Sequence, residues 1–104
     1  MPILSYLRFA LTEDADVTVF ERDLEAMRVL AASQPGHLWS AVARSTHEER
    51  VWVVASEWEE VEQVRAWEHH PEHEVLYDIW EPRYREPFVH RRFVPWVRPV
   101  EPAG

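Results

Sequence analysis

The residues with the most chemical potential lie between Trp58 and His73, directly after the apolar run 51–55. A strand that ends in Trp58, a short helix that carries Trp67, and a histidine just beyond Pro71 can together form the wall of a pocket. Indole and imidazole rings combine a large packing surface with a polar nitrogen that can hold a ligand. The segment therefore predicts a binding pocket, and no other segment offers comparable chemistry.

Each of these rings also has a purely structural interpretation. Trp58 would simply fill the space between sheet and helix. A hydrogen bond from its indole N–H would not show a functional role, because buried tryptophans usually have such a partner whatever their role. His73 would pack against the core or face water behind a helix that starts at Pro71. Both interpretations predict the same local structure, so the residues alone leave the choice open.

The histidines of this segment also suggest a metal cluster, with Glu68 and Glu72 beside them. Metal ligands on one helix need a spacing of three or four residues, but Pro71 breaks the helix between His70 and His73. A solvated turn rich in histidine is therefore favoured over a metal site. We expect neither a metal nor another cofactor.

The composition describes a single folded domain, residues 1–104, with a loose tail at 98–104. Hydrophobic residues make up 46% of the chain and charged residues 29%, with only two glycines, which excludes disordered and fibrous classes. Six tryptophans must fill an aromatic core, a cavity or an interface. The absence of cysteine excludes disulfides, thiolate metal sites and a cysteine nucleophile.

The charge pattern limits the partners of the protein. The formal net charge is −8, every basic residue is an arginine, and the longest basic run is Arg91-Arg92. This pattern argues against nucleic acid and anionic membranes as partners. No apolar run approaches the roughly 20 residues that a membrane helix requires. The N-terminal residues lack the basic region and cleavage site of a secretory signal, so we expect a cytoplasmic protein.

Hydrophobic periodicity divides the chain into strands and helices. The expected order is a strand at 3–11, a helix at 17–31, strands at 37–45 and 51–58, a helix at 59–70, a further helix from Pro71 to just before Pro82, and a strand at 87–97. The polar loop 46–50 predicts that the second and third strands pair antiparallel.

This order predicts an α+β fold, a ferredoxin-like βαββαβ sandwich with an antiparallel sheet and helices on one face. If the second face were solvated, its strands would alternate, yet residues 51–55 are apolar throughout. A second copy of the chain is the simplest cover for that face. We therefore expect a homodimer that closes two sheets into an α/β barrel.

The chain resembles the antibiotic biosynthesis monooxygenase family, whose members are dimeric α/β-barrel proteins. The resemblance runs from the first strand to Trp96. It rests on Pro35-Gly36 before the second strand, Trp58 at the end of the third strand, a helix with an acidic start, and the sequence His70-Pro71-Glu72-His73. It implies a pocket between the sheet and the helices of each subunit.

The resemblance implies two different chemistries for such a pocket. Some members oxygenate polycyclic phenols to quinones without metal or flavin, because the deprotonated substrate itself reduces dioxygen. Other members bind haem through a helix histidine, here His73, and degrade it with a pocket tryptophan and an asparagine near the first strand. The chain contains no asparagine, which disfavours haem degradation. The oxygenating members also use an asparagine four positions before the tryptophan that ends the third strand, where this chain has Val54.

The leading hypothesis is a cofactor-independent monooxygenase-like protein that acts on a small aromatic or polyketide-like compound. The candidate catalytic residues are His73 and Trp58. A phenolate needs a base to form and a cation or donor to hold it, and the candidate substrate-binding residues are Trp67, Tyr6, His90 and Arg92. The alternative is a non-catalytic dimeric small-molecule-binding or scaffold module of the same fold. Val54 favours this alternative, which predicts a pocket filled by side chains.

Overall fold

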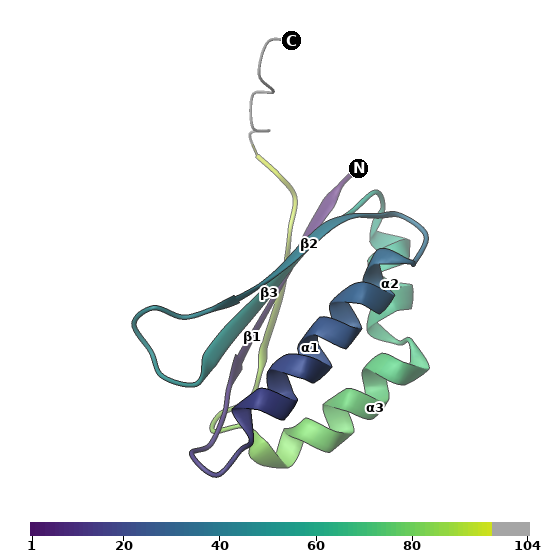
Figure 1. Ribbon diagram of the computed structural model, residues 1–104. Coiled ribbons are helices and arrows are strands. Elements are labelled where there is room, and N and C mark those ends of the chain that lie inside the picture. Colours follow the sequence, from purple (N-terminus) through teal and green to yellow (C-terminus); the bar gives the residue numbers. More distant parts are fainter. Residues whose placement is uncertain (97–104) are drawn as a thin grey trace.

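The computed structural model describes residues 1–96 and contains one four-stranded antiparallel sheet in the order β2-β3-β1-β4 (Figure 1). The strands are β1 (Ile3–Ala10), β2 (His37–Arg44), β3 (Val51–Trp58) and β4 (Val89–Phe93). The helices are α1 (Val17–Ala32), α2 (Val61–Glu68), α3 (Pro71–Trp80) and the short 3-10 helix η1 (Glu81–Arg83). The predicted α+β ferredoxin-like fold with an antiparallel sheet is confirmed. The expected tail 98–104 and the expected strand end at Val97 lie outside the described residues.

Local hydrogen bonds explain where the helices begin. The Asp16 side chain caps α1 by accepting from the backbone N–H of Val19 at 3.2 Å. Helix α3 begins at Pro71, and the His70 imidazole accepts from the backbone N–H of Glu72 at 3.2 Å. Pro71 therefore ends one helical segment and opens the next, as the sequence predicts.

Two elements are shorter than the sequence predicts at both ends, whereas β1 and β2 each end one residue early. Helix α2 spans 61–68 instead of 59–70, because the extended backbone of His70 before Pro71 interrupts the helical run. Strand β4 spans 89–93 instead of 87–97. Its last pair joins Phe93 to Leu4, so little of β1 is left beyond that point to pair with a longer strand.

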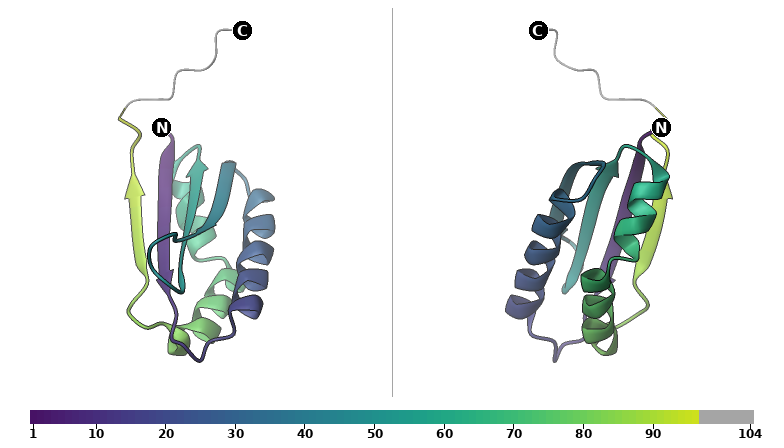
Figure 2. Two further views of the ribbon diagram at one scale, coloured as in Figure 1. Left: turned by 60° about the vertical axis from the view of Figure 1, so that its left-hand side comes forward. Right: turned by 90° about the vertical axis from the view of Figure 1, so that its right-hand side faces the viewer.

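The helices cover one face of the sheet, which we call the inner face. Figure 2 shows α1, α2 and α3 together on this side. Alternation along β1 places Ser5, Leu7 and Phe9 on the inner face and Tyr6 and Arg8 on the outer face. No helix among residues 1–96 covers the outer face.

Aromatic residues build the core between sheet and helices. Phe20 of α1 packs edge-on against Trp52 and Trp80, with ring centroids 5.0 and 4.9 Å apart. A second cluster contains Trp58 and Trp67 together with Val64 of α2. These two clusters flank the space in which the candidate site lies. Within residues 1–96, every helix is too short or too polar to cross a membrane.

Candidate functional site

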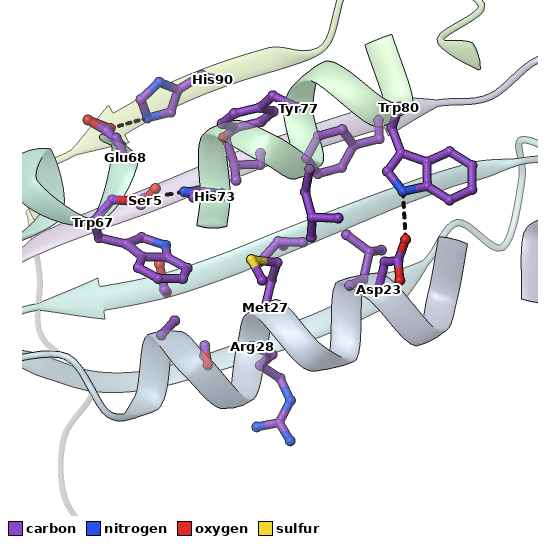
Figure 3. A pocket seen from close by; sticks show the side chains of 18 of the residues that line it. Ser5, Asp23, Met27, Arg28, Trp67, Glu68, His73, Tyr77, Trp80 and His90 are labelled. Carbon is purple, nitrogen blue, oxygen red and sulfur yellow. Dashed lines mark hydrogen bonds and ion pairs between the residues drawn. The ribbon is translucent and has the colours of Figure 1, made fainter. Parts of the chain in front are cut away.

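A cavity lies between the inner face of the sheet and helices α1 and α3 (Figure 3). Apolar side chains form most of its lining, and the polar groups are a few hydroxyls, two imidazoles and the charged groups at its edges. The space open to the centres of water molecules is ≈ 60 Å³. That is enough for a few waters or a small ring, whereas pockets for drug-sized ligands measure about 300–1,000 Å³. A ligand of two or more rings therefore enters only when lining side chains move.

His73 of α3 lines this cavity and is almost fully buried, with 6% of its surface exposed. Its Nδ1 lies 3.1 Å from the backbone carbonyl oxygen of Trp67. A carbonyl can only accept a hydrogen bond, so Nδ1 carries the proton and donates, and Nε2 keeps its lone pair. No residue within 1–96 hydrogen-bonds to Nε2. His73 is therefore a neutral imidazole with a fixed tautomer and an unused acceptor.

Burial lowers the pKa of His73 below its usual value, because the cavity disfavours the charged ring. The hydrogen bond to the Trp67 carbonyl and the negative charge of Glu68 oppose this shift without reversing it. The ring consequently remains neutral at pH 7. A neutral, fixed imidazole can accept a proton from a ligand hydroxyl group.

His73 is held in a stack of flat rings. Trp67 lies on one side and Tyr77 on the other, each with its ring centroid 4.6 Å from that of His73. Tyr77 stacks in turn on Phe88, with centroids 4.9 Å apart and an interplanar angle of 14°. The stack fixes the imidazole more firmly than the hydrogen bond alone. Trp67 and His73, which the sequence predicts in one pocket, are indeed both on its wall.

Two tyrosines that the sequence analysis did not select also line the cavity. Burial raises the pKa of Tyr77 and of Tyr84 far above the usual value for a phenol. Both hydroxyl groups therefore stay protonated at any physiological pH. They can donate hydrogen bonds to a ligand, but they cannot act as bases there.

Three serines form a polar row on the cavity floor. Ser5, Ser56 and Ser40 stand directly opposite one another on β1, β3 and β2, and all three line the cavity. Sequence reasoning missed this row. The inward position of each serine could be read from strand alternation, but the alignment of the three depends on strand register, which only the paired sheet defines.

Trp58 lies behind this row and does not line the cavity. Its indole is fully buried, with 0% of its surface exposed. Nε1 donates to the hydroxyl oxygen of Ser56 at 2.9 Å. Trp58 was predicted to act on the substrate directly, whereas the structure places the Ser56 hydroxyl between its indole N–H and the cavity.

His90 and Arg92 meet at one edge of the site, where both approach Glu68 of α2. The Arg92 guanidinium forms a bidentate ion pair with the Glu68 carboxylate. His90 Nε2 lies 2.8 Å from Glu68 Oε2, although it makes no aligned hydrogen bond with any described residue (Figure 3). His90 lines the cavity, and Arg92 is engaged by Glu68 beside it.

Tyr6 lies away from this group of residues. It pairs with Ala55 of β3 and with Arg91 of β4 on the outer face of the sheet. The predicted site residues are therefore divided between the two faces of the sheet. Trp67 and His90 lie on the cavity wall with His73, whereas Tyr6 lies on the outer face.

The histidines near Pro71 have separate surroundings. His69 Nδ1 lies 3.4 Å from a Glu74 oxygen at the surface, His70 caps α3, and His73 is buried in the ring stack. Among residues 1–96, no three side chains of the histidine, cysteine, aspartate or glutamate types come together as metal ligands.

A haem group does not fit this arrangement. Iron would bind to Nε2 of His73, whose ring is stacked against Trp67 and Tyr77. The cavity of ≈ 60 Å³ is far too small for a porphyrin. We derive no haem chemistry for this site.

Comparison with known protein families gives a match to residues 3–78, which is most of the chain. The matching family model is described as antibiotic biosynthesis monooxygenase. No match was found among curated proteins.

Several solved structures share the fold. Rv0793 from Mycobacterium tuberculosis is 14% identical with a TM-score of 0.86, and the match covers 96% of this chain and 100% of that one. SnoaB, a cofactor-independent oxygenase from Streptomyces nogalater, is 17% identical with a TM-score of 0.78, covering 98% of each chain. A dimeric ferredoxin-like protein from Thermobifida fusca is 19% identical with a TM-score of 0.74, covering 91% of this chain and 92% of that one. At these identities the likeness shows the fold alone.

Proposed function

Because the chain belongs to the antibiotic biosynthesis monooxygenase family, we propose that it is a cofactor-independent monooxygenase-like protein acting on a small aromatic or polyketide-like phenol. The observation that carries this proposal is the state of His73. It is a buried, neutral imidazole whose Nδ1 is committed to a backbone carbonyl and whose Nε2 has no partner within residues 1–96. Such a group is suited to removing the proton of a phenol.

The reaction needs few groups from the protein. The phenol O–H bond breaks and the proton passes to Nε2 of His73, which leaves a phenolate. The electron-rich phenolate ring supplies the electrons that reduce dioxygen. Overall, one ring C–H becomes a C=O, the second oxygen atom leaves as water, and phenol plus dioxygen gives a quinone plus water. The apolar lining helps by keeping bulk water away from the reacting ring.

The ring stack supports a planar ligand. Trp67, His73 and Tyr77 present flat surfaces on one wall, and Phe88 continues the stack. Aromatic ligands gain from offset stacking on such rings. The size of the cavity favours one ring over several in the conformation described, so the ligand class is a small phenol, with larger ones requiring side-chain movement.

Oxygen uptake with a panel of one- and two-ring phenols, including hydroxynaphthalenes, tests this proposal. We expect consumption of dioxygen and formation of a quinone, and a loss of about 10²-fold or more in rate for His73→Gln, because that variant lacks the base. His69→Gln is the matched control, since His69 is exposed and lies at the surface. Absence of both binding and oxygen uptake across the panel would refute the proposal.

The alternative function is a non-catalytic small-molecule-binding module of the same fold. The open cavity differs from the filled pocket that this alternative predicts, but a pocket with few polar groups can bind flat apolar ligands without reacting with them. Val54 in the cavity lining also supports it, because valine offers no hydrogen bond to orient a substrate. The same panel separates the two functions: saturable binding of phenols without dioxygen consumption favours the binding module.

We also propose that the protein is a homodimer assembled through the outer face of the sheet. Two aromatic side chains of that face, Trp39 and Phe93, are 45% and 52% exposed in the single chain. Exposed aromatic groups of this size on a sheet face are typical of an interface. The similarity to a dimeric ferredoxin-like protein supports the same assembly.

A further inference from the structure

The three serines on the cavity floor differ in their hydrogen bonds. The Ser40 hydroxyl is engaged with Nε2 of His37 at 3.0 Å. The Ser56 hydroxyl accepts from the Trp58 indole at 2.9 Å. The Ser5 hydroxyl has no side-chain partner among residues 1–96, although Ser5 is 93% buried, with 7% of its surface exposed. Because Ser5 lines the cavity, its hydroxyl group can form a hydrogen bond with a ligand that enters there.

Trp58 determines the direction of the Ser56 hydroxyl. An indole N–H only donates, so the Ser56 oxygen is the acceptor in this contact and its own hydrogen points elsewhere. No acceptor for that hydrogen is present among the described residues. Because Ser56 lines the cavity and is otherwise buried, the hydrogen is available to a ligand there.

Strand register brings Ser56 and Ser5 within reach of one ligand atom. The two residues are direct partners across β1 and β3. Side chains in this relation have Cβ atoms about 4.5–5.5 Å apart. Since an O–H···O hydrogen bond is about 2.5–3.0 Å long, a single oxygen between the two hydroxyls can accept from both.

We propose that Ser5 and Ser56 form a two-donor site for the anionic oxygen of a phenol deprotonated by His73, and that Trp58 is a positioning residue acting through Ser56. This inference rests on the proposed function and deepens it, since it assigns the group that holds the phenolate. The ligand class is a planar aromatic compound with a phenolic oxygen. His73 and Ser5 both belong to the cavity lining (Figure 3), so one oxygen can lose its proton on one side and accept two hydrogen bonds on the other.

The probe for this site is 4-nitrophenol, a one-ring phenol whose phenolate form absorbs visible light, so its binding can be followed with dioxygen excluded. We expect binding to the wild-type protein to lower the apparent pKa of the phenol, seen as an increase in phenolate absorbance at fixed pH. Ser5→Ala and Ser56→Ala should each weaken phenolate binding by about tenfold or more, because a hydrogen bond to a charged group is lost. Binding of nitrobenzene, which has no phenolic oxygen, should stay within about twofold of wild type in both variants.

Ser40→Ala is the matched control. It removes a hydroxyl from the same row, but from β2, which β3 separates from Ser5 on β1, so Ser40 does not flank the proposed position of the phenolic oxygen. It should therefore leave the absorbance change and the affinity for 4-nitrophenol within about twofold of wild type. An effect of Ser40→Ala as large as that of Ser56→Ala would contradict the assignment, because it would show a general disturbance of the floor.

Trp58→Phe tests the positioning role, since phenylalanine keeps an aromatic ring but has no N–H. We expect it to weaken phenolate binding in the wild-type background and to have no further effect in a Ser56→Ala background. That lack of additivity separates action through Ser56 from a loss of packing, which would reduce binding in both backgrounds. Equal losses in both backgrounds would overturn the role of Trp58.

The outcomes separate this inference from the proposed function. Oxygen uptake that depends on His73 but not on either serine overturns the two-donor site and leaves the monooxygenase function standing. Binding of 4-nitrophenol with the expected serine dependence, but without dioxygen consumption by any phenol, supports the two-donor site within a binding module. Failure of every phenol to bind overturns both.

Discussion

At the level of single residues, the chemistry of the site depends on the protonation state of one imidazole. A histidine in water is partly charged near its ordinary pKa of 6.5, but burial between Trp67 and Tyr77 lowers the pKa of His73. The folded protein therefore binds this proton less readily than the unfolded chain does. The same property that keeps His73 available as a base makes the fold sensitive to acid.

The stability of the protein should consequently fall as the pH falls below about 6.5. Above that value both the folded and the unfolded chain hold His73 neutral, and this histidine contributes nothing to the pH dependence. Below it, the unfolded chain takes up a proton that the folded chain resists, and each unit of difference in pKa is worth about 1.4 kcal/mol. Urea unfolding of the wild type and of His73→Phe between pH 8 and pH 5 measures this effect. The free energy of unfolding should change less steeply with pH in the variant than in the wild type.

His37 provides a comparison for that experiment. Its pKa is also lowered, first by burial and second by the positive charge of Arg28. His37→Gln should therefore independently reduce the pH dependence of the free energy of unfolding. Among the wild type, the two single variants and the double variant, the double variant should have the weakest pH dependence. If His73→Phe keeps the full wild-type pH dependence, His73 is not held neutral by burial.

At the level of the elements, the strength of the hydrophobic pattern decided what the sequence could predict. Strand β3 has the predicted bounds, because a continuous apolar run between a polar loop and an acidic helix start leaves little choice. Strand β4 was predicted too long, because its alternating pattern continues past the end of its partner β1. Pattern alone does not show where a neighbouring strand stops.

The sequence could predict those parts of the site that lie within one segment of the chain. It could not predict those parts that are formed by residues from different strands. Trp67 and His73 are six residues apart, and a proline between two helices is enough to place them on the same wall. The contact between Ser5 and Ser56 joins residues far apart in the sequence and requires the register of β1 and β3. Tyr6 lies on the outer face for the related reason that neighbouring strand positions point to opposite faces, so the serine next to it faces the cavity.

Helix α1 sets the size of the cavity through Met27, a flexible side chain on its lining. Met27→Ala should enlarge the cavity and strengthen the binding of two-ring phenols relative to one-ring phenols. The truncation should also lower the free energy of unfolding by about 1–3 kcal/mol, because packing against the half-buried methionine is lost. Titration with 1-naphthol and phenol, together with urea unfolding, measures both effects. Val29→Ala on the same helix is the control, since Val29 is 58% exposed; unchanged relative affinities in Met27→Ala would show that another element limits the cavity.

At the level of the whole molecule, the sheet is unequally covered. The inner face packs on α1, α2 and α3, whereas no described helix covers the outer face (Figure 2). The outer face carries the aromatic residues Trp39, Tyr6 and Phe93. A chain of 104 residues gains relatively little core of its own, so burial of this face against a second copy would add stability that the single chain lacks.

The homodimer can be tested by light scattering after size exclusion. The wild type should have about twice the 12.4 kDa mass of the single chain, because the two outer faces cover each other. Trp39→Asp should shift the protein toward the monomer, since it places a charge where apolar surface is buried in the dimer. Val75→Asp is the matched control: Val75 is 56% exposed on α3, on the helical side of the molecule, so its replacement should leave the mass unchanged. A wild type that remains a monomer at high concentration would contradict the homodimer. Dissociation by Val75→Asp but not by Trp39→Asp would place the interface away from the sheet.

Because the cavity opens on the inner side of the sheet, a folded monomeric variant should still bind 4-nitrophenol, which would show that each subunit contains a complete site.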